Sequence, residues 1–168
     1  MSKKEEGIPF TKMTGTGNDF IVIDNRPGRF SGNEHAFFNR ICRRRFSVGA
    51  DGVILVEEGE SAPVRMRYFN ADGKEAAMCG NGGRCVAFYA VEKGIVRNPE
   101  FTIQAQDGLH KARVEDRHVS LSISPARDFK TEHEILKEKD FQEGGFLNVS
   151  FDRLTARARF EEGTDASE

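Results

Sequence analysis

The stretch "MCGNGGRCVAFYAVEKG" (residues 78–94) decides the fold, because it joins a glycine-rich turn to a segment with apolar residues on nearly every side. The apolar positions predict a helix over roughly residues 82–93, and Gly94 suits the position just after a helix end. A helix that is apolar all round is normally buried inside its domain. We therefore expect a β-sheet that wraps around this helix.

The segments on either side of this helix predict such a sheet. Short apolar or alternating runs, separated by turn-forming residues, are typical of strands. A first helix is expected over residues 31–45, and the last three runs predict consecutive antiparallel strands. The expected strands are residues 9–15, 20–26, 53–58, 64–70, 100–106, 108–116 and 118–124. This order predicts an α+β domain with a curled, mostly antiparallel sheet around a central buried helix.

The first expected helix carries start and stop signals of its own. Ser31 and Glu34 form the S-x-x-E pattern of a capping box at a helix N-terminus. Apolar side chains at 37, 38, 41 and 42 give the helix one apolar stripe. The arginines at 43–45 suit its C-terminal end, because the helix dipole favours cations there.

The chain changes character after residue 124. Residues 1–124 contain all the expected core elements, so we expect them to form one domain. Residues 126–145 are charged and contain few apolar side chains, which is typical of a linker. Residues 146–151 and 154–160 each have the composition of a strand. We expect 125–168 to be too short and too polar to form a second core.

Composition and charge exclude several classes of function. A net charge of −2 provides no strong basic field for nucleic acid. The sequence contains no apolar run close to the roughly 18 residues that a membrane span requires. The N-terminal "MSKKEEG" lacks the apolar core of a secretory signal. We expect a cytoplasmic protein without nucleic-acid or membrane partners.

The three cysteines do not suggest disulfides or a metal site. An odd number of cysteines in a chain without an export signal favours reduced thiols. Cys79 and Cys85 are six residues apart, which fits neither a C-x-x-C redox pair nor the usual zinc spacing. The four histidines are scattered along the chain, so no metal is expected.

Cys79 is the residue with the strongest chemical signal. A helix N-terminus carries unsatisfied N–H groups and a partial positive charge, which stabilise a bound anion or a thiolate. Gly80 and its neighbouring glycines leave the backbone amides open to a small carboxylate, and Asn81 can cap the helix or point at the ligand. The alternative is that Cys79 is inert core packing, which is the usual role of a free cysteine. Cys42 and Cys85 lie on helices and are expected in the core.

Two asparagines share this polar, glycine-rich setting. Asn18 lies in "GTGND" and Asn70 in "FNADG", each at the end of an expected strand. Either asparagine can bind a ligand through its amide. Taken singly, each is explained as well by local turn chemistry, since asparagine is a favoured turn residue. The "GTGND" segment has neither of the two glycine spacings of phosphate-binding loops.

Together these segments resemble the diaminopimelate epimerase family. The resemblance rests on "FTKMTGTGNDFIVID", "RRRFSVGADGVILV", "MRYFNADGKEAAMCGNGGRCVAFY" and "FTIQAQDG", in this order, and covers about residues 9–124. It implies a fold of two similar α+β domains with one catalytic cysteine from each. It also implies conversion of LL- to meso-diaminopimelate by two thiols, for lysine and cell-wall synthesis, without pyridoxal phosphate or metal. The family commonly forms homodimers.

The resemblance assigns roles to five residues. Cys79 resembles the catalytic cysteine of the first domain, which removes or returns the α-proton. Gly80 and Asn81 resemble the pair that binds the substrate at the helix mouth. Asn18 and Asn70 resemble amides that contact the substrate. Some members carry glutamine where this chain has Gly52, so that contact is not expected here.

The sequence departs from the family in its second half. No A-C-G-[TS]-G-like motif and no cysteine follow Cys85, so residues 125–168 are expected to be a linker and a truncated remnant of the second domain. The chain alone is then expected to be an incomplete epimerase. The alternative is an inactive lone domain, or a gene fragment, that at most binds a small amino-acid carboxylate. Proline racemases and phenazine-pathway isomerases fit the motifs less well, and a redox module lacks its C-x-x-C.

Overall fold

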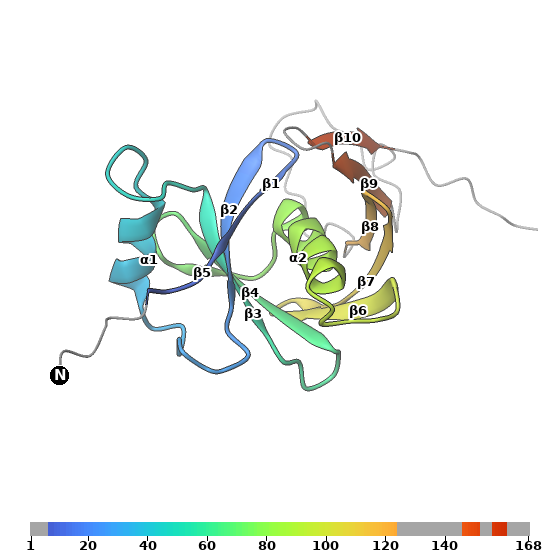
Figure 1. Cartoon of the computed structure of the whole chain (residues 1–168), viewed down its shortest axis with the longest axis horizontal. Coiled ribbons are helices and arrows are strands. Elements are labelled where there is room, and N and C mark those ends of the chain that lie inside the picture. Colours follow the sequence, from blue (N-terminus) through green and yellow to red (C-terminus); the bar gives the residue numbers. More distant parts are fainter. Residues whose placement is uncertain (1–6, 124–145, 152–155, 161–168) are drawn as a thin grey trace, which may run out of the picture.

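The computed structural model describes residues 7–123, 146–151 and 156–160. Within these residues the chain forms two helices and one ten-stranded sheet (Figure 1). The elements are β1 (Thr11–Gly15), β2 (Asn18–Asp24), α1 (His35–Cys42), β3 (Gly52–Glu57), β4 (Val64–Asn70), β5 (Glu75–Ala76), α2 (Gly80–Glu92), β6 (Glu100–Ala105), β7 (Gly108–Glu115), β8 (His118–Ser122), β9 (Phe146–Phe151) and β10 (Ala156–Phe160).

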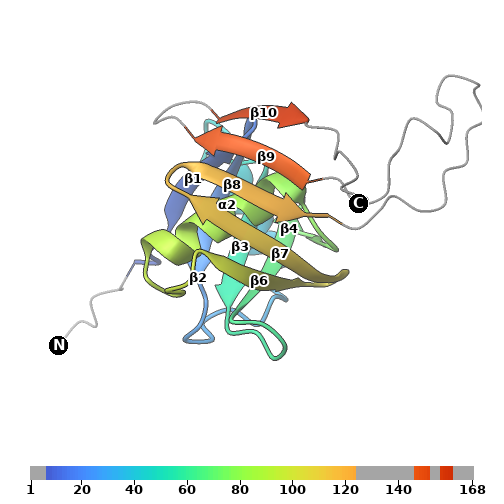
Figure 2. The same cartoon turned by 90° about the vertical axis from the view of Figure 1, so that its right-hand side faces the viewer.

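The sheet curls around helix α2, as the sequence predicts. Its strands follow the order β1-β2-β3-β4-β6-β7-β8-β9-β10, with β5 paired to β4. The pairings β2–β3 and β4–β6 are parallel, and the others are antiparallel. Figure 2 shows β6, β7 and β8 across one side of α2, with β2, β3 and β4 behind it. The predicted α+β class is confirmed.

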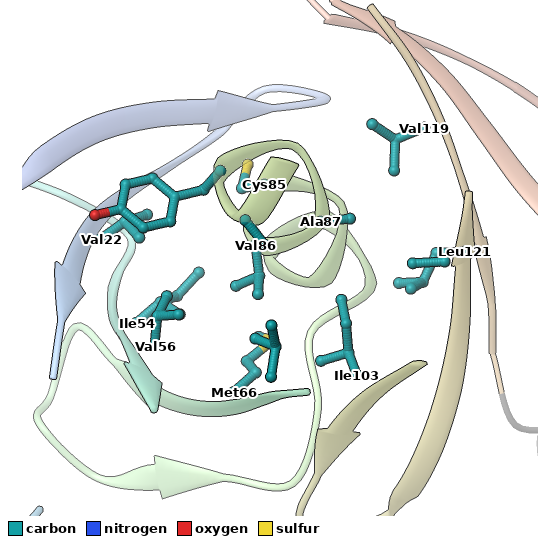
Figure 3. Packing of buried hydrophobic residues seen from close by; sticks show 14 of the residues in the cluster. Val22, Ile54, Val56, Met66, Cys85, Val86, Ala87, Ile103, Val119 and Leu121 are labelled. Carbon is teal, nitrogen blue, oxygen red and sulfur yellow. The ribbon is translucent and has the colours of Figure 1, made fainter. Parts of the chain in front are cut away.

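The larger core fills the space between α2 and the sheet. Cys85, Val86, Ala87 and Ala90 are fully buried on the helix. They meet side chains from both halves of the curl, which surround the helix in Figure 3: Val22, Ile54, Val56, Met66, Ile103, Val119 and Leu121. Each large apolar side chain buried in this way contributes roughly 1.5–3 kcal/mol to folding.

Glycines allow α2 to lie this close to the sheet. A Cβ atom at Gly83 would lie 2.6 Å from Cδ2 of Leu121 on β8. A Cβ atom at Gly82 would lie 3.0 Å from Cδ1 of Ile54 on β3. The helix ends before Gly94, whose φ of 64° is readily adopted by glycine.

A second core lies on the other face of the sheet, under α1. Phe38 of α1 is fully buried, and its ring centroid is 4.6 Å from that of Phe69 on β4. Strands β2 and β3 send alternate side chains into the two cores. This explains why "FIVI" and "VILV" are continuously apolar: both faces of these strands are covered.

Helix α1 is shorter than predicted, and the capping-box prediction is wrong. The helix begins at His35, with Glu34 as its N-cap residue and no side-chain cap hydrogen bond within the described structure. The Glu34 carboxylate instead accepts hydrogen bonds from Ser31 and from the N–H of Gly32, which fixes a turn before the helix. The helix ends at Cys42, so the arginines at 43–45 follow it rather than form its last turn.

The other predicted elements are confirmed within a few residues. Strand β5 was not predicted, because two residues are too few to show alternation; Glu75 and Ala76 pair with Phe69 and Tyr68. The predicted linker at 126–145 lies outside the described residues. Strand β9 pairs with β8, and β10 pairs with β9, so both extend the same sheet. The division of the chain at residue 124 stays a prediction. Neither described helix is long and apolar enough to cross a membrane.

Candidate active site

The N-terminus of α2 presents the Cys79 thiol as expected from the sequence. Cys79 is the N-cap residue, in an extended conformation with φ −136° and ψ 111°, and its side chain is partly exposed. Its carbonyl accepts the N–H of Gly83 at 2.7 Å. The N–H groups of the three residues between them therefore have no intrahelical acceptor, which leaves this helix end open to an anion.

The other two thiols lie in the core, as predicted. Cys85 is fully buried, and burial raises its pKa to about 12. Cys42 is 4% exposed, and burial raises its pKa to about 11. Both remain protonated at neutral pH, and Cys79 is the one partly exposed thiol among the three cysteines.

Asn81, two residues after Cys79 in the first turn of α2, meets Asn18. The Asn81 Nδ2 group donates to Oδ1 of Asn18 at 2.5 Å. The Asn18 Nδ2 group in turn donates to Oδ2 of Asp51 at 3.1 Å. The meeting depends on the tight turn between β1 and β2, where Thr16 and Gly17 have φ values of 51° and 89°. This turn places the first residue of β2 against the first turn of α2.

Charged groups hold Asp51 in place. Arg44 binds Oδ1 of Asp51 at 2.8 Å and also bonds Asp19, whose Oδ2 lies 2.8 Å from the Lys12 ammonium. Burial opposes ionisation of Asp19, but hydrogen bonds and charge from Arg44 and Lys12 outweigh burial and lower its pKa. The Asp51 carboxylate thus has one oxygen on Arg44 and the other on Asn18 and the N–H of Asp19.

Arg84 lies on the inner side of this asparagine pair. Its side chain is fully buried, and its Nη2 group donates to Oγ1 of Thr16 at 2.8 Å and to Oδ1 of Asn81. No sequence pattern singled out Arg84, Thr16 or Asp51 as part of the site. The sequence did contain a signal for Arg84, because a charged side chain in a buried and otherwise apolar helix requires a structural or functional explanation.

Asn70 reaches the same edge of the sheet by a different route. The parallel strands β2 and β3 begin there, and the antiparallel strand β4 ends there, with Gly52 opposite both Phe20 and Asn70. Asn70 is exposed. A Cβ at Gly52 would lie 2.5 Å from both the Phe69 carbonyl oxygen and the Tyr68 ring, so this backbone has no room for a side chain at 52.

The structure thus brings four of the five predicted residues together at one helix mouth: Cys79, Gly80, Asn81 and Asn18. Asn70 lies at the same end of the sheet, and no hydrogen bond links its side chain to the other four within the described residues. A Cβ at Gly80 would meet nothing closer than 3.8 Å, so space remains above the first turn. Among the described residues, no group of three acidic, histidine or cysteine side chains could hold a metal.

Comparison with known proteins then assigns the family. The family described as "Diaminopimelate epimerase" matches residues 10–127. The chain belongs to the diaminopimelate epimerase family. It is 45% identical over 108 residues to the diaminopimelate epimerase of Flavobacterium psychrophilum, which covers 64% of the chain and 42% of that protein. It is 54% identical over 89 residues to that of Archaeoglobus fulgidus, which covers 52% of the chain and 32% of that protein.

Solved structures show the same fold with low sequence identity. A probable proline racemase from Agrobacterium radiobacter superposes with a TM-score of 0.57 at 18% identity, covering 85% of this chain and 49% of that one. A phenazine biosynthesis protein of the PhzF family from Enterococcus faecalis gives 0.56 at 13% identity, covering 74% and 48%. The chain spans less than half the length of the diaminopimelate epimerases it matches.

Proposed function

We propose that the chain supplies the Cys79 half of a site that interconverts LL- and meso-diaminopimelate without a cofactor. The observation that carries this proposal is the partly exposed Cys79 thiol at the N-terminus of α2, beside the hydrogen-bonded amides of Asn81 and Asn18. Membership of the diaminopimelate epimerase family supports the substrate and the reaction. We further propose a cytoplasmic protein that forms homodimers.

The geometry suits removal of an α-proton. That proton is a very weak acid, and its loss places negative charge on the neighbouring carboxylate. The free N–H groups of Gly80, Asn81 and Gly82 can stabilise this charge as it develops. The Cα–H bond breaks, the Cys79 thiolate takes the proton as an S–H bond, and the electron pair moves onto the carboxylate. Asn70 and Asn18 are proposed to orient the substrate.

Inversion needs a second acid on the opposite face of the substrate. A second thiol would deliver its proton to Cα and become the thiolate that starts the reverse reaction. Neither Cys42 nor Cys85 can do this, because both are buried. We therefore propose that the second acid comes from outside residues 1–168.

The burial of these two thiols also favours a second candidate. In this candidate the chain binds an amino-acid carboxylate at the mouth of α2 and does not invert it.

Proton exchange separates the two candidates. The purified chain is incubated with LL- or meso-diaminopimelate in D2O, and loss of the α-proton signal and change of configuration are followed by NMR. Loss of the α-proton signal without inversion, abolished by Cys79→Ala, would support the Cys79 half-site. Inversion by the chain alone would show that a second copy supplies the second acid, and would overturn the proposal that this acid comes from outside residues 1–168. Binding by calorimetry with neither α-proton exchange nor inversion would support the second candidate. If no diaminopimelate binds, both candidates are wrong.

A further inference from the structure

Arg84 is a buried cation whose role the proposed reaction does not explain. Its side chain has no exposed surface, although it lies on a helix whose other buried side chains are mostly apolar. Two of its nitrogens, Nε and Nη1, have no hydrogen-bond partner within the described part of the chain. None of the ion pairs found among the described residues includes Arg84.

Stability does not account for an arginine at this position. Burial disfavours the charged guanidinium and lowers the pKa of Arg84. Replacing a buried charge by an apolar side chain of similar volume is often neutral or stabilising. Residues that break such a local rule are commonly found at functional sites.

The contact with Asn81 gives the guanidinium a specific effect. Arginine has only donors, whereas an asparagine amide has an acceptor oxygen on one side and a donor nitrogen on the other. The Arg84 Nη2 group therefore requires the Asn81 oxygen to face it. The Asn81 nitrogen must then face Asn18, where it donates to Oδ1.

The direction of one amide fixes the direction of the next. With its oxygen on Asn81, the Asn18 side chain turns its nitrogen toward Asp51. Thr16, in the turn before Asn18, accepts a second hydrogen bond from the same Arg84 nitrogen. The Arg84 guanidinium therefore bonds both Asn81 on α2 and Thr16 in the β1–β2 turn, which are the two segments that meet at the site.

We propose that Arg84 is the positioning residue of this site, which fixes the orientation of the Asn81 and Asn18 amides before an amino-acid ligand binds. The binding part of this proposal rests on the proposed function, and the orientation part does not. Preorganised amides bind with a smaller loss of side-chain freedom than mobile ones.

The test compares Arg84→Met with Arg113→Met in the full chain. Arg113 is an exposed arginine of β7 whose ion pairs are with Glu100 and Glu115 and with none of the site residues, so it controls for loss of an arginine. The first readout is the NMR signals of the side-chain amides of Asn81 and Asn18, assigned with Asn81→Ala and Asn18→Ala. We expect both pairs of signals to move toward free-amide positions in Arg84→Met and to stay in place in Arg113→Met.

The second readout is a double-mutant cycle on binding of meso-diaminopimelate by calorimetry. Arg84→Met should weaken binding about tenfold, the size expected when a hydrogen bond to a charged group is lost. In an Asn81→Ala background, the same change should add little, because Arg84 acts through Asn81. Full additivity would overturn the proposal, since a residue with a purely structural role weakens binding equally in both backgrounds.

The two proposals fail in different ways. If the wild-type chain binds no diaminopimelate, the proposed function fails, and the amide signals still decide the role of Arg84. If the amide signals stay in place in Arg84→Met, the positioning role is wrong whatever the binding result. If Arg84→Met does not fold, Arg84→Gln, which removes the charge and can offer Asn81 either a donor or an acceptor, is scored by the same criteria.

Discussion

The three cysteines should differ in alkylation rate by factors that follow from their burial. The pKa values of Cys42 and Cys85 are raised to about 11 and about 12, whereas Cys79 is partly exposed. At about pH 8 a thiol with an ordinary pKa of roughly 8.5 is about one-quarter thiolate, and thiols at about 11 and about 12 are about 0.1% and about 0.01% thiolate. Since the thiolate is the reacting form, ionisation alone slows Cys42 by roughly 200-fold and Cys85 by roughly 2,000-fold relative to an ordinary exposed thiol.

The assay is a time course with iodoacetamide, quenched and digested, with each cysteine peptide quantified by mass spectrometry. Cys79 should be labelled first, and Cys79→Ala should remove the fast phase and leave the other two rates unchanged. In denaturant all three cysteines should react at similar rates, which controls for the reagent and the peptides. Native labelling of Cys42 or Cys85 at the rate of Cys79 would show that the burial argument, and with it the choice of Cys79, is wrong.

Three further predictions concern the turn beside the site, the second core and the charge of Asp19. Gly15→Ala places a Cβ 2.7 Å from the Asn81 carbonyl oxygen; it should cost about 1–3 kcal/mol of unfolding free energy in a denaturant titration and move the Asn81 side-chain amide signals. Phe38→Ala should cost about 3–5 kcal/mol, because Phe38 is fully buried. Phe46→Ala, at a residue that is 81% exposed, should change the free energy of unfolding by about 0.5 kcal/mol or less, and equal losses in the two variants would contradict the assigned core. The lowered pKa of Asp19 means that its ionised form stabilises the fold above the unfolded pKa of about 4 and that this contribution is lost as pH falls toward the folded pKa. The difference in unfolding free energy between wild type and Asp19→Asn should therefore be largest above about pH 5 and become smaller toward about pH 3. A difference that does not change with pH would refute the stabilising role of the ionised Asp19 carboxylate.

The sequence was sufficient for the features that depend on local periodicity. The apolar residues at 86–91 predicted a buried helix with a sheet around it, and the structure has this arrangement. The alternating and continuous apolar runs predicted every strand of the first 122 residues except the two-residue β5. The start of α1 was missed because the Glu34 carboxylate accepts hydrogen bonds from the turn before it, and the S-x-x-E pattern is the same in both arrangements.

The network behind the site could not be predicted in the same way. Asp51 reaches Asn18 because β2 and β3 pair in parallel with Phe20 opposite Gly52, and this register is a property of the folded sheet. Thr16 meets Arg84 across 68 residues of sequence. Contacts of this kind depend on how the β1–β2 turn meets α2, which no local pattern encodes.

The two glycines inside the first turns of α2 have a consequence for the accuracy of the site. Leu121 on one side and Ile54 on the other leave no room for a methyl group at 83 and little at 82, so the helix is confined between opposite walls of the sheet. A shift of about 1 Å at a reacting group can lower a rate about a hundredfold. If Cys79 is the reacting group that we propose, the position of its sulfur depends on the apolar side chains packed against Gly82 and Gly83, Leu121 and Ile54 among them. Substitutions that change the size of Leu121 or Ile54 should therefore shift the position of the Cys79 sulfur by small amounts.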